Sequence, residues 1–195
     1  MRFEIANLLG TDAPFIEVPW SDADGESFLD LREDASAIVR IGAARENPPM
    51  AAFLVALNGD ASVFCTVRAK TWADTDASRA ASNSASAFHS RVDLTFADSK
   101  FSSKEHQEDV VRQLVELWMK EPSAETFSAR LEILPCRSVS GRWPGEAALR
   151  IVLTARGDTP QKAQMRWGIG IAKVQQALLF VSRALRMKTA SKLEE

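Results

Sequence analysis

The sequence predicts an α+β fold, in which a mostly antiparallel sheet carries an amphipathic mid-chain helix and a long C-terminal helix packed on it. Three observations indicate this class. Apolar and polar residues alternate in several segments, an amphipathic helical pattern occupies about residues 102–120, and a second helical pattern begins near residue 160. The 195 residues suffice for one sizeable core, so we expect a single domain over residues 1–195.

Residues 1–72 are expected to form the strand-rich front half of this domain. Asn58, Gly59 and Asp60 suit a tight turn, which predicts a hairpin made of Met50–Leu57 and Ser62–Lys70. Shorter strands are expected upstream, at Arg2–Leu8, Phe15–Val18, Ser27–Leu31 and Ala37–Ala43.

Residues 73–87 consist almost entirely of Ala, Ser, Asp and Thr. Such a segment buries too little apolar surface to offset the conformational entropy lost on ordering, so we expect a long mobile loop. A frayed helix is the alternative, because alanine is abundant there.

Residues 88–188 form the back half, with the predicted order strand, helix, strand, strand, helix. Alternation predicts the first strand at residues 89–96. Ser102 and Glu105 then form a capping-box pattern that opens a helix ending near Lys120.

Two more alternating segments, at residues 127–133 and 147–155, predict a second hairpin. Thr159 followed by Pro160 is an N-cap with a proline at the first helical position, and it begins the terminal helix.

Charge is segregated along the chain. Residues 1–34 hold nine acids and two arginines, whereas residues 160–192 hold seven cations and no acid. The net charge of −2 gives the whole chain no general attraction to nucleic acid, so any basic surface must be local. The two oppositely charged ends either meet a partner or face each other.

The terminal helix is predicted to have a core side and a basic side. At 100° per residue, Trp167 and Leu178 belong to the core side, opposite most of the cations. Ile169 and Phe180 nevertheless project to the basic side, which is more apolar than a solvated face requires. We therefore expect this side to be covered by the acidic N-terminal region, by a partner protein or second copy, or by nucleic acid.

These features predict a non-enzymatic protein-interaction or assembly component that binds a protein partner or associates with itself. The alternative is a nucleic-acid-binding protein that uses the same surface. No catalytic residue and no cofactor is assigned. The expected surface joins the terminal helix to the second hairpin and comprises Arg130, Arg150, Arg156, Lys162, Arg166, Lys173 and Arg183.

Gly168, Ile169 and Gly170 precede a helical run, and this short stretch resembles the pyrophosphate-binding turn of GNAT acetyltransferases. Backbone amides at a helix start bind the coenzyme A phosphates in that family, so the resemblance implies acyl transfer as a further function. Met165 stands where the family's pattern has Arg or Gln. In the other interpretation, the two glycines lie inside or near the start of the helix and let it pack closely on the sheet.

Metal and membrane sites are not predicted. His89, His106, Cys65 and Cys136 never come within a metal-ligand spacing of one another. Cys65 lies in an apolar run where a free thiol packs as a small hydrophobe, which favours a reducing compartment. Without an N-terminal apolar segment or an uninterrupted apolar span, we expect a cytoplasmic protein that does not contact a membrane.

Overall fold

A computed structural model describes residues 2–10, 12, 15–21, 27–74, 86–101, 104–119, 127–138 and 146–191. Its strands are β1 (Arg2–Asn7), β2 (Ile16–Val18), β3 (Phe64–Ala73), β4 (Ser86–Phe96), β5 (Phe127–Ser138) and β6 (Ala147–Gly157). Its helices are α1 (Gly42–Glu46), α2 (Pro48–Asn58), α3 (Lys104–Met119) and α4 (Pro160–Ser191), with 3-10 turns η1 (Ala35–Arg40) and η2 (Ser99–Phe101).

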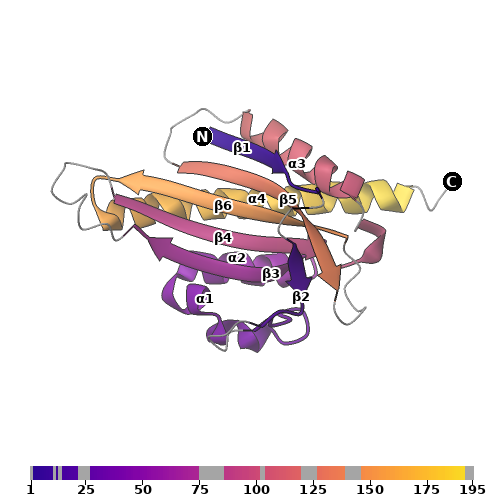
Figure 1. Ribbon diagram of the computed structural model, residues 1–195, viewed down its shortest axis with the longest axis horizontal. Coiled ribbons are helices and arrows are strands. Elements are labelled where there is room, and N and C mark those ends of the chain that lie inside the picture. Colours follow the sequence, from indigo (N-terminus) through magenta and orange to yellow (C-terminus); the bar gives the residue numbers. More distant parts are fainter. Residues whose placement is uncertain are drawn as a thin grey trace.

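The strands form one sheet in the order β1-β5-β6-β4-β3, with β2 beside the second half of β5 (Figure 1). The pairs β3–β4, β4–β6 and β5–β6 are antiparallel, whereas β1 and β2 run parallel to β5. The predicted α+β class with a mostly antiparallel sheet is therefore confirmed.

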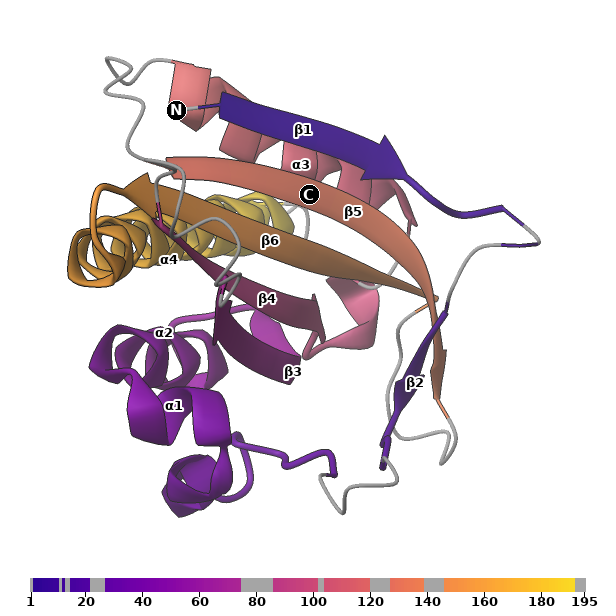
Figure 2. The same ribbon diagram turned by 60° about the vertical axis from the view of Figure 1, so that its left-hand side comes forward.

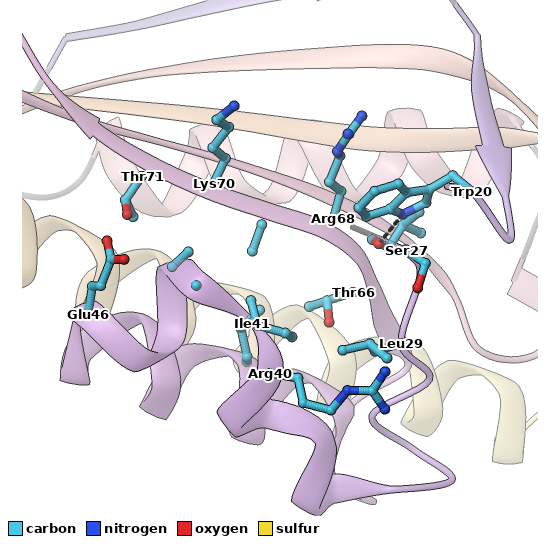
Figure 3. A pocket seen from close by; sticks show the side chains of 15 residues that line it. Trp20, Ser27, Leu29, Arg40, Ile41, Glu46, Thr66, Arg68, Lys70 and Thr71 are labelled. Carbon is cyan, nitrogen blue, oxygen red and sulfur yellow. Dashed lines mark hydrogen bonds between the residues drawn. The ribbon is translucent and has the colours of Figure 1, made fainter. Parts of the chain in front are cut away.

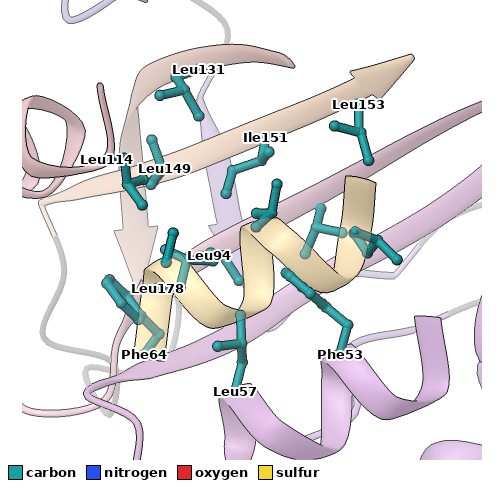
Figure 4. Close-up of a cluster of buried hydrophobic side chains, with 14 of the residues drawn as sticks. Phe53, Leu57, Phe64, Leu94, Leu114, Leu131, Leu149, Ile151, Leu153 and Leu178 are labelled. Carbon is teal, nitrogen blue, oxygen red and sulfur yellow. The ribbon is translucent and has the colours of Figure 1, made fainter. Parts of the chain in front are cut away.

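Helices α2, α3 and α4 cover one face of the sheet (Figure 2). Along β6, the odd-numbered residues Leu149, Ile151 and Leu153 point toward the helices and are buried (Figure 4). The predicted core side of α4 is confirmed, because each of its residues is at most 3% exposed. These residues are Trp167, Ile171, Val174, Leu178, Val181 and Leu185.

We call the opposite side of the sheet the free face, because α2, α3 and α4 do not cover it. A second apolar cluster covers one end of this face, where Ile16 and Val18 of β2 pack with Val67 and Leu134. Strand β2 thus lies across one end of the free face rather than over the helices (Figure 1).

The back half of the chain follows its predicted order. Strands β4, β5 and β6 and helix α3 lie where alternation and helical periodicity predict them. The N-cap of α4 is also confirmed, because the Thr159 hydroxyl accepts a hydrogen bond from the Lys162 amide at 3.2 Å. The predicted cap residue Ser102 lies outside the described residues.

The predicted first hairpin is wrong in its first strand, because Met50–Leu57 lies within helix α2. Pro48 and Pro49 occupy the first helical positions, where a missing N–H group costs no hydrogen bond. The buried side chains then recur at helical spacing, at Met50, Phe53, Leu54 and Leu57.

Asn58 explains why the predicted hairpin does not form. Its side-chain amide donates to the Leu54 carbonyl at 2.8 Å and to the Thr66 hydroxyl at 2.6 Å. Its side-chain oxygen accepts from the Thr66 amide at 3.0 Å. Asn58 therefore fixes the end of α2 to strand β3 instead of reversing a hairpin.

Of the four short strands predicted upstream, two are confirmed and two are not. Strands are confirmed within Arg2–Leu8 and Phe15–Val18. The strand at Ala37–Ala43 is wrong, because Asp34 caps a 3-10 turn by accepting from the Ser36 amide, and α1 follows. Ser27–Leu31 contains a single bridge residue, Ser27, rather than a strand. Of the predicted loop at residues 73–87, residues 75–85 lie outside the described residues.

Candidate functional site

Three of the seven predicted binding residues lie on the free face of the sheet. Arg150 and Arg156 alternate along β6 with the core residue Ile151, so they point away from the helices. Arg130 alternates with Leu131 on β5 in the same way.

Arg150 forms the centre of an ion-pair network on this face. Its Nε and Nη2 donate to the two carboxylate oxygens of Asp93, at 2.6 and 3.0 Å. Burial alone would lower the pKa of Arg150, but the hydrogen bonds and charge of Asp93 outweigh it and raise the pKa. Asp93 is itself buried, so Arg150 compensates a carboxylate that would otherwise be buried without a counter-charge, and this guanidinium is not available to a ligand.

Arg130 is also paired within the chain. Its Nε lies 2.8 Å from Oε1 of Glu132, and its Nη1 lies 4.0 Å from Oε1 of Glu4 on β1. The acidic N-terminal region therefore meets the second hairpin through Glu4.

Two predicted residues belong to the start of α4 and bind neighbouring groups. Lys162 Nζ lies 2.8 Å from a carboxylate oxygen of Asp158, and Arg166 donates to the Arg156 carbonyl at 2.7 Å. They hold the turn between β6 and α4.

The outer side of α4 is different, because large apolar side chains stand exposed along it. Met165, Ile169, Phe180 and Met187 are 61%, 48%, 56% and 69% exposed. At 100° per residue they fall within an arc of about 60°, opposite the core side. We call these four residues the outer stripe.

The outer stripe carries cations and no acid. Arg183 and Lys162 fall within the same arc, Lys162 being paired with Asp158, and Lys173 lies just outside the arc. The exposure of the outer-stripe side chains also bears on the expectation that the acidic N-terminal region covers the basic side of this helix. Glu4 and β2 lie at the sheet, so the described acidic residues of the N-terminal region do not bury Ile169 or Phe180.

The seven predicted cations thus form two groups rather than one surface. Arg130, Arg150 and Arg156 are on the free face, whereas Lys162, Arg166, Lys173 and Arg183 are on α4.

The glycine pair lies inside α4, more than two turns after its start at Pro160. Amides at that depth bond within the helix and are not free to bind phosphates. A Cβ atom on Gly170 would lie 3.0 Å from both Leu153 and Phe127 on the sheet. The close-packing interpretation therefore holds for Gly170, whereas Gly168 faces Pro49 of α2 rather than the sheet. The pair does not form the phosphate-binding turn at a helix start on which the acetyltransferase resemblance depends.

His89, which sequence reasoning set aside, joins a polar group on the free face. Its Nδ1 lies 2.9 Å from the Thr154 hydroxyl, its Nε2 lies 3.1 Å from Asp74, and its ring stacks on Trp72. The order carboxylate, imidazole, hydroxyl is that of a nucleophilic triad. Thr154 lies inside β6, however, where backbone amides pair with β4 and β5 rather than with an oxyanion. We assign it no catalysis.

Sequence reasoning also missed a groove of about 380 Å³ along the outer edge of β3 (Figure 3). One wall is β3 with Arg68 and Lys70, and the other wall is η1 and α1 with Arg40 and Glu46. The predicted hairpin would have covered this edge. The signal that reveals it is the pair Pro48 and Pro49, which turns the supposed neighbouring strand into a helix.

Among the described residues, no three His, Cys, Asp or Glu side chains lie close enough to hold a metal ion. The described helices include none with the length and apolar character needed to cross a membrane. Comparisons of the chain with protein-family models, curated proteins and solved structures find no match.

Proposed function

We propose that this protein is a non-enzymatic interaction component that binds an acidic, amphipathic helix of a partner protein along the outer stripe of α4. The observation that carries the proposal is the exposure of Ile169 and Phe180 on a helix without a single acid. Isolated exposed apolar residues are common on protein surfaces. That four of them share one side of one helix, at spacings of 4, 11 and 7 residues, supports a docking face there.

The shape of the surface favours a helical partner. Met165 and Met187 are 22 positions apart, which is about 33 Å along an α-helix. A partner helix can contact the whole line through apolar residues at spacings of three and four.

Charge decides the kind of partner. The cations Lys173 and Arg183 flank or interrupt the stripe, so carboxylates on the partner helix gain favourable charge contacts at the rim. A second copy of α4 would instead bring cations against cations. Charge complementarity therefore favours an acidic partner over self-association.

The test uses a designed amphipathic peptide with leucine on one side and glutamate on the other, and a matched peptide with lysine in place of glutamate. We expect the glutamate helix to bind at least about tenfold more tightly by fluorescence anisotropy, and binding to weaken with salt. The double variant Ile169→Glu, Phe180→Glu should abolish binding. Val39→Glu is the matched control, because Val39 is 68% exposed but lies on η1.

Equal binding of both peptides, or unchanged binding by the double variant, would contradict the proposal. Light scattering of the protein alone adds a second criterion. We expect a monomer, and a dimer that the double variant dissociates would show that the stripe binds another copy instead.

A further inference from the structure

Strand β3 is an edge strand of the sheet. The two halves of its outer edge differ. In the first half, the chain's own side chains satisfy the backbone. Arg32 donates to the Phe64 carbonyl at 3.0 Å, the Thr66 amide donates to Asn58 at 3.0 Å, and the Trp20 indole donates to the Val67 carbonyl at 2.8 Å. Unprotected edges invite pairing with another strand, and these contacts block it there.

The second half of the edge has no such cover from the described residues. The Asp74 amide donates to the Ala87 carbonyl at 3.0 Å, which makes Asp74 a hydrogen-bonded partner of β4. Because the pattern alternates along an antiparallel pair, Lys70 and Trp72 also bond to β4. The amides and carbonyls of Ala69 and Thr71 therefore point outward, away from β4.

This uncovered half forms one wall of the groove along β3 (Figure 3). The open part of the edge ends at Trp20. Its indole N–H donates to the Val67 carbonyl, and the Arg68 guanidinium lies over its ring, with Cζ 4.0 Å from the ring centroid. An irregularity in the pairing between Thr66 and Arg68 separates the two halves of the edge at the same place.

The charges around the groove select the ligand. Among the described lining residues, Arg40, Arg68 and Lys70 contribute three cations, and Glu46 contributes the one carboxylate. Glu46 has its own cation, since Arg45 Nη2 lies 3.8 Å from its Oε1. An extended segment with acidic side chains thus complements the groove in both backbone hydrogen bonding and charge.

We infer that the edge of β3 at Ala69 and Thr71 is a second binding site, which adds an acidic, extended peptide segment of a partner as a further strand of the sheet. Backbone hydrogen bonds to Ala69 and Thr71 provide the affinity, and Arg40 and Lys70 select carboxylates. This site is independent of the outer stripe, which is on α4.

The probe is a short peptide of alternating valine and glutamate, and its control alternates valine and lysine. We expect the glutamate peptide to bind at least about tenfold more tightly, and to slow hydrogen exchange of the Ala69 and Thr71 amides, measured by NMR. Ala69→Pro should abolish binding, because it removes an outward N–H while leaving the β3–β4 pairing intact.

Ala73→Pro is the matched control. Ala73 also lies at a position whose amide points outward, but it is beyond the groove lining, so this variant should bind normally. The charge variant Arg40→Glu, Lys70→Glu should also abolish binding, and it leaves every backbone N–H group in place. It therefore tests the site even if Ala69→Pro does not fold. The stripe variant Ile169→Glu, Phe180→Glu should bind the strand peptide as the wild type does.

Three results would overturn the inference. One is failure of the glutamate peptide to bind. Another is equal binding of the lysine peptide. The third is protection of the Ala69 and Thr71 amides that rises with protein concentration without peptide, which would show that a second copy pairs at this edge.

Discussion

Arg150 and Asp93 face each other across the β4–β6 pair and share two hydrogen bonds, at 2.6 and 3.0 Å. Removing Asp93 leaves Arg150 without the carboxylate that accepts both hydrogen bonds, and among the described carboxylates only Glu132 remains near it, with Oε2 3.8 Å from Nη1. Asp93→Ala should therefore lower the free energy of unfolding by about 3–5 kcal/mol, measured by urea denaturation.

The control for this prediction is Lys162→Met, which breaks the exposed pair with Asp158. That substitution should leave the urea midpoint nearly unchanged, because water already screens the pair. A similar decrease in the free energy of unfolding for both variants would show that the Arg150–Asp93 pair contributes no more to stability than an exposed ion pair does.

Replacing the two glycines of α4 with alanine, one at a time, should change the stability of the protein in opposite directions. At Gly170, an added Cβ meets Leu153 and Phe127 at 3.0 Å, so Gly170→Ala should lose about 1–3 kcal/mol through overpacking. At Gly168, the nearest atom is Pro49 Cγ at 3.4 Å, so Gly168→Ala should gain up to about 1 kcal/mol from helix propensity. Thermal unfolding followed by circular dichroism measures both, and stabilisation by Gly170→Ala would contradict the packing described.

The two cysteines predict a loss of stability at alkaline pH. Burial raises the pKa of Cys65 to about 12 and that of Cys136 to about 11, from 9.0. The unfolded thiols ionise near their ordinary pKa while the folded ones stay protonated. Their contribution to stability is therefore full below pH 9 and declines as the pH rises toward 11.

Urea denaturation at about pH 8 and pH 10 checks this sign. The wild type should lose more unfolding free energy between the two pH values than the variant Cys65→Ala, Cys136→Ala, which has no thiol to ionise. Equal losses would mean that these thiols are as accessible in the folded chain as in the unfolded one.

The sequence predicted the back half of the fold well because its elements are strongly periodic. Leu149, Ile151 and Leu153 alternate with the less buried residues Arg150, Val152 and Thr154. The apolar residues from Trp167 to Leu185 keep a helical period, so local pattern and burial agree. In the front half they conflict. The apolar run Met50–Leu57 suits a strand or a helix, and Pro48 and Pro49 decide between them.

The sequence predicted only part of the candidate site, because local patterns do not specify contacts between distant segments. Helical periodicity placed Ile169 and Phe180 correctly on the outer side of α4. It gave no information on pairs between distant segments, such as Asp93 with Arg150 or Glu4 with Arg130, which engage the hairpin arginines within the chain. The parallel pairing of β1 with β5 joins segments over 120 residues apart, and no local pattern specifies it.

Methionine methyl NMR tests the proposed outer stripe most directly. Met165 and Met187 lie near the two ends of the stripe, whereas Met50 is 0% exposed in the core and serves as an internal reference. On addition of the glutamate amphipathic peptide, the account predicts that the methyl signals of Met165 and Met187 shift together while that of Met50 stays in place. Binding of the peptide with no shift at Met165 and Met187 would contradict it.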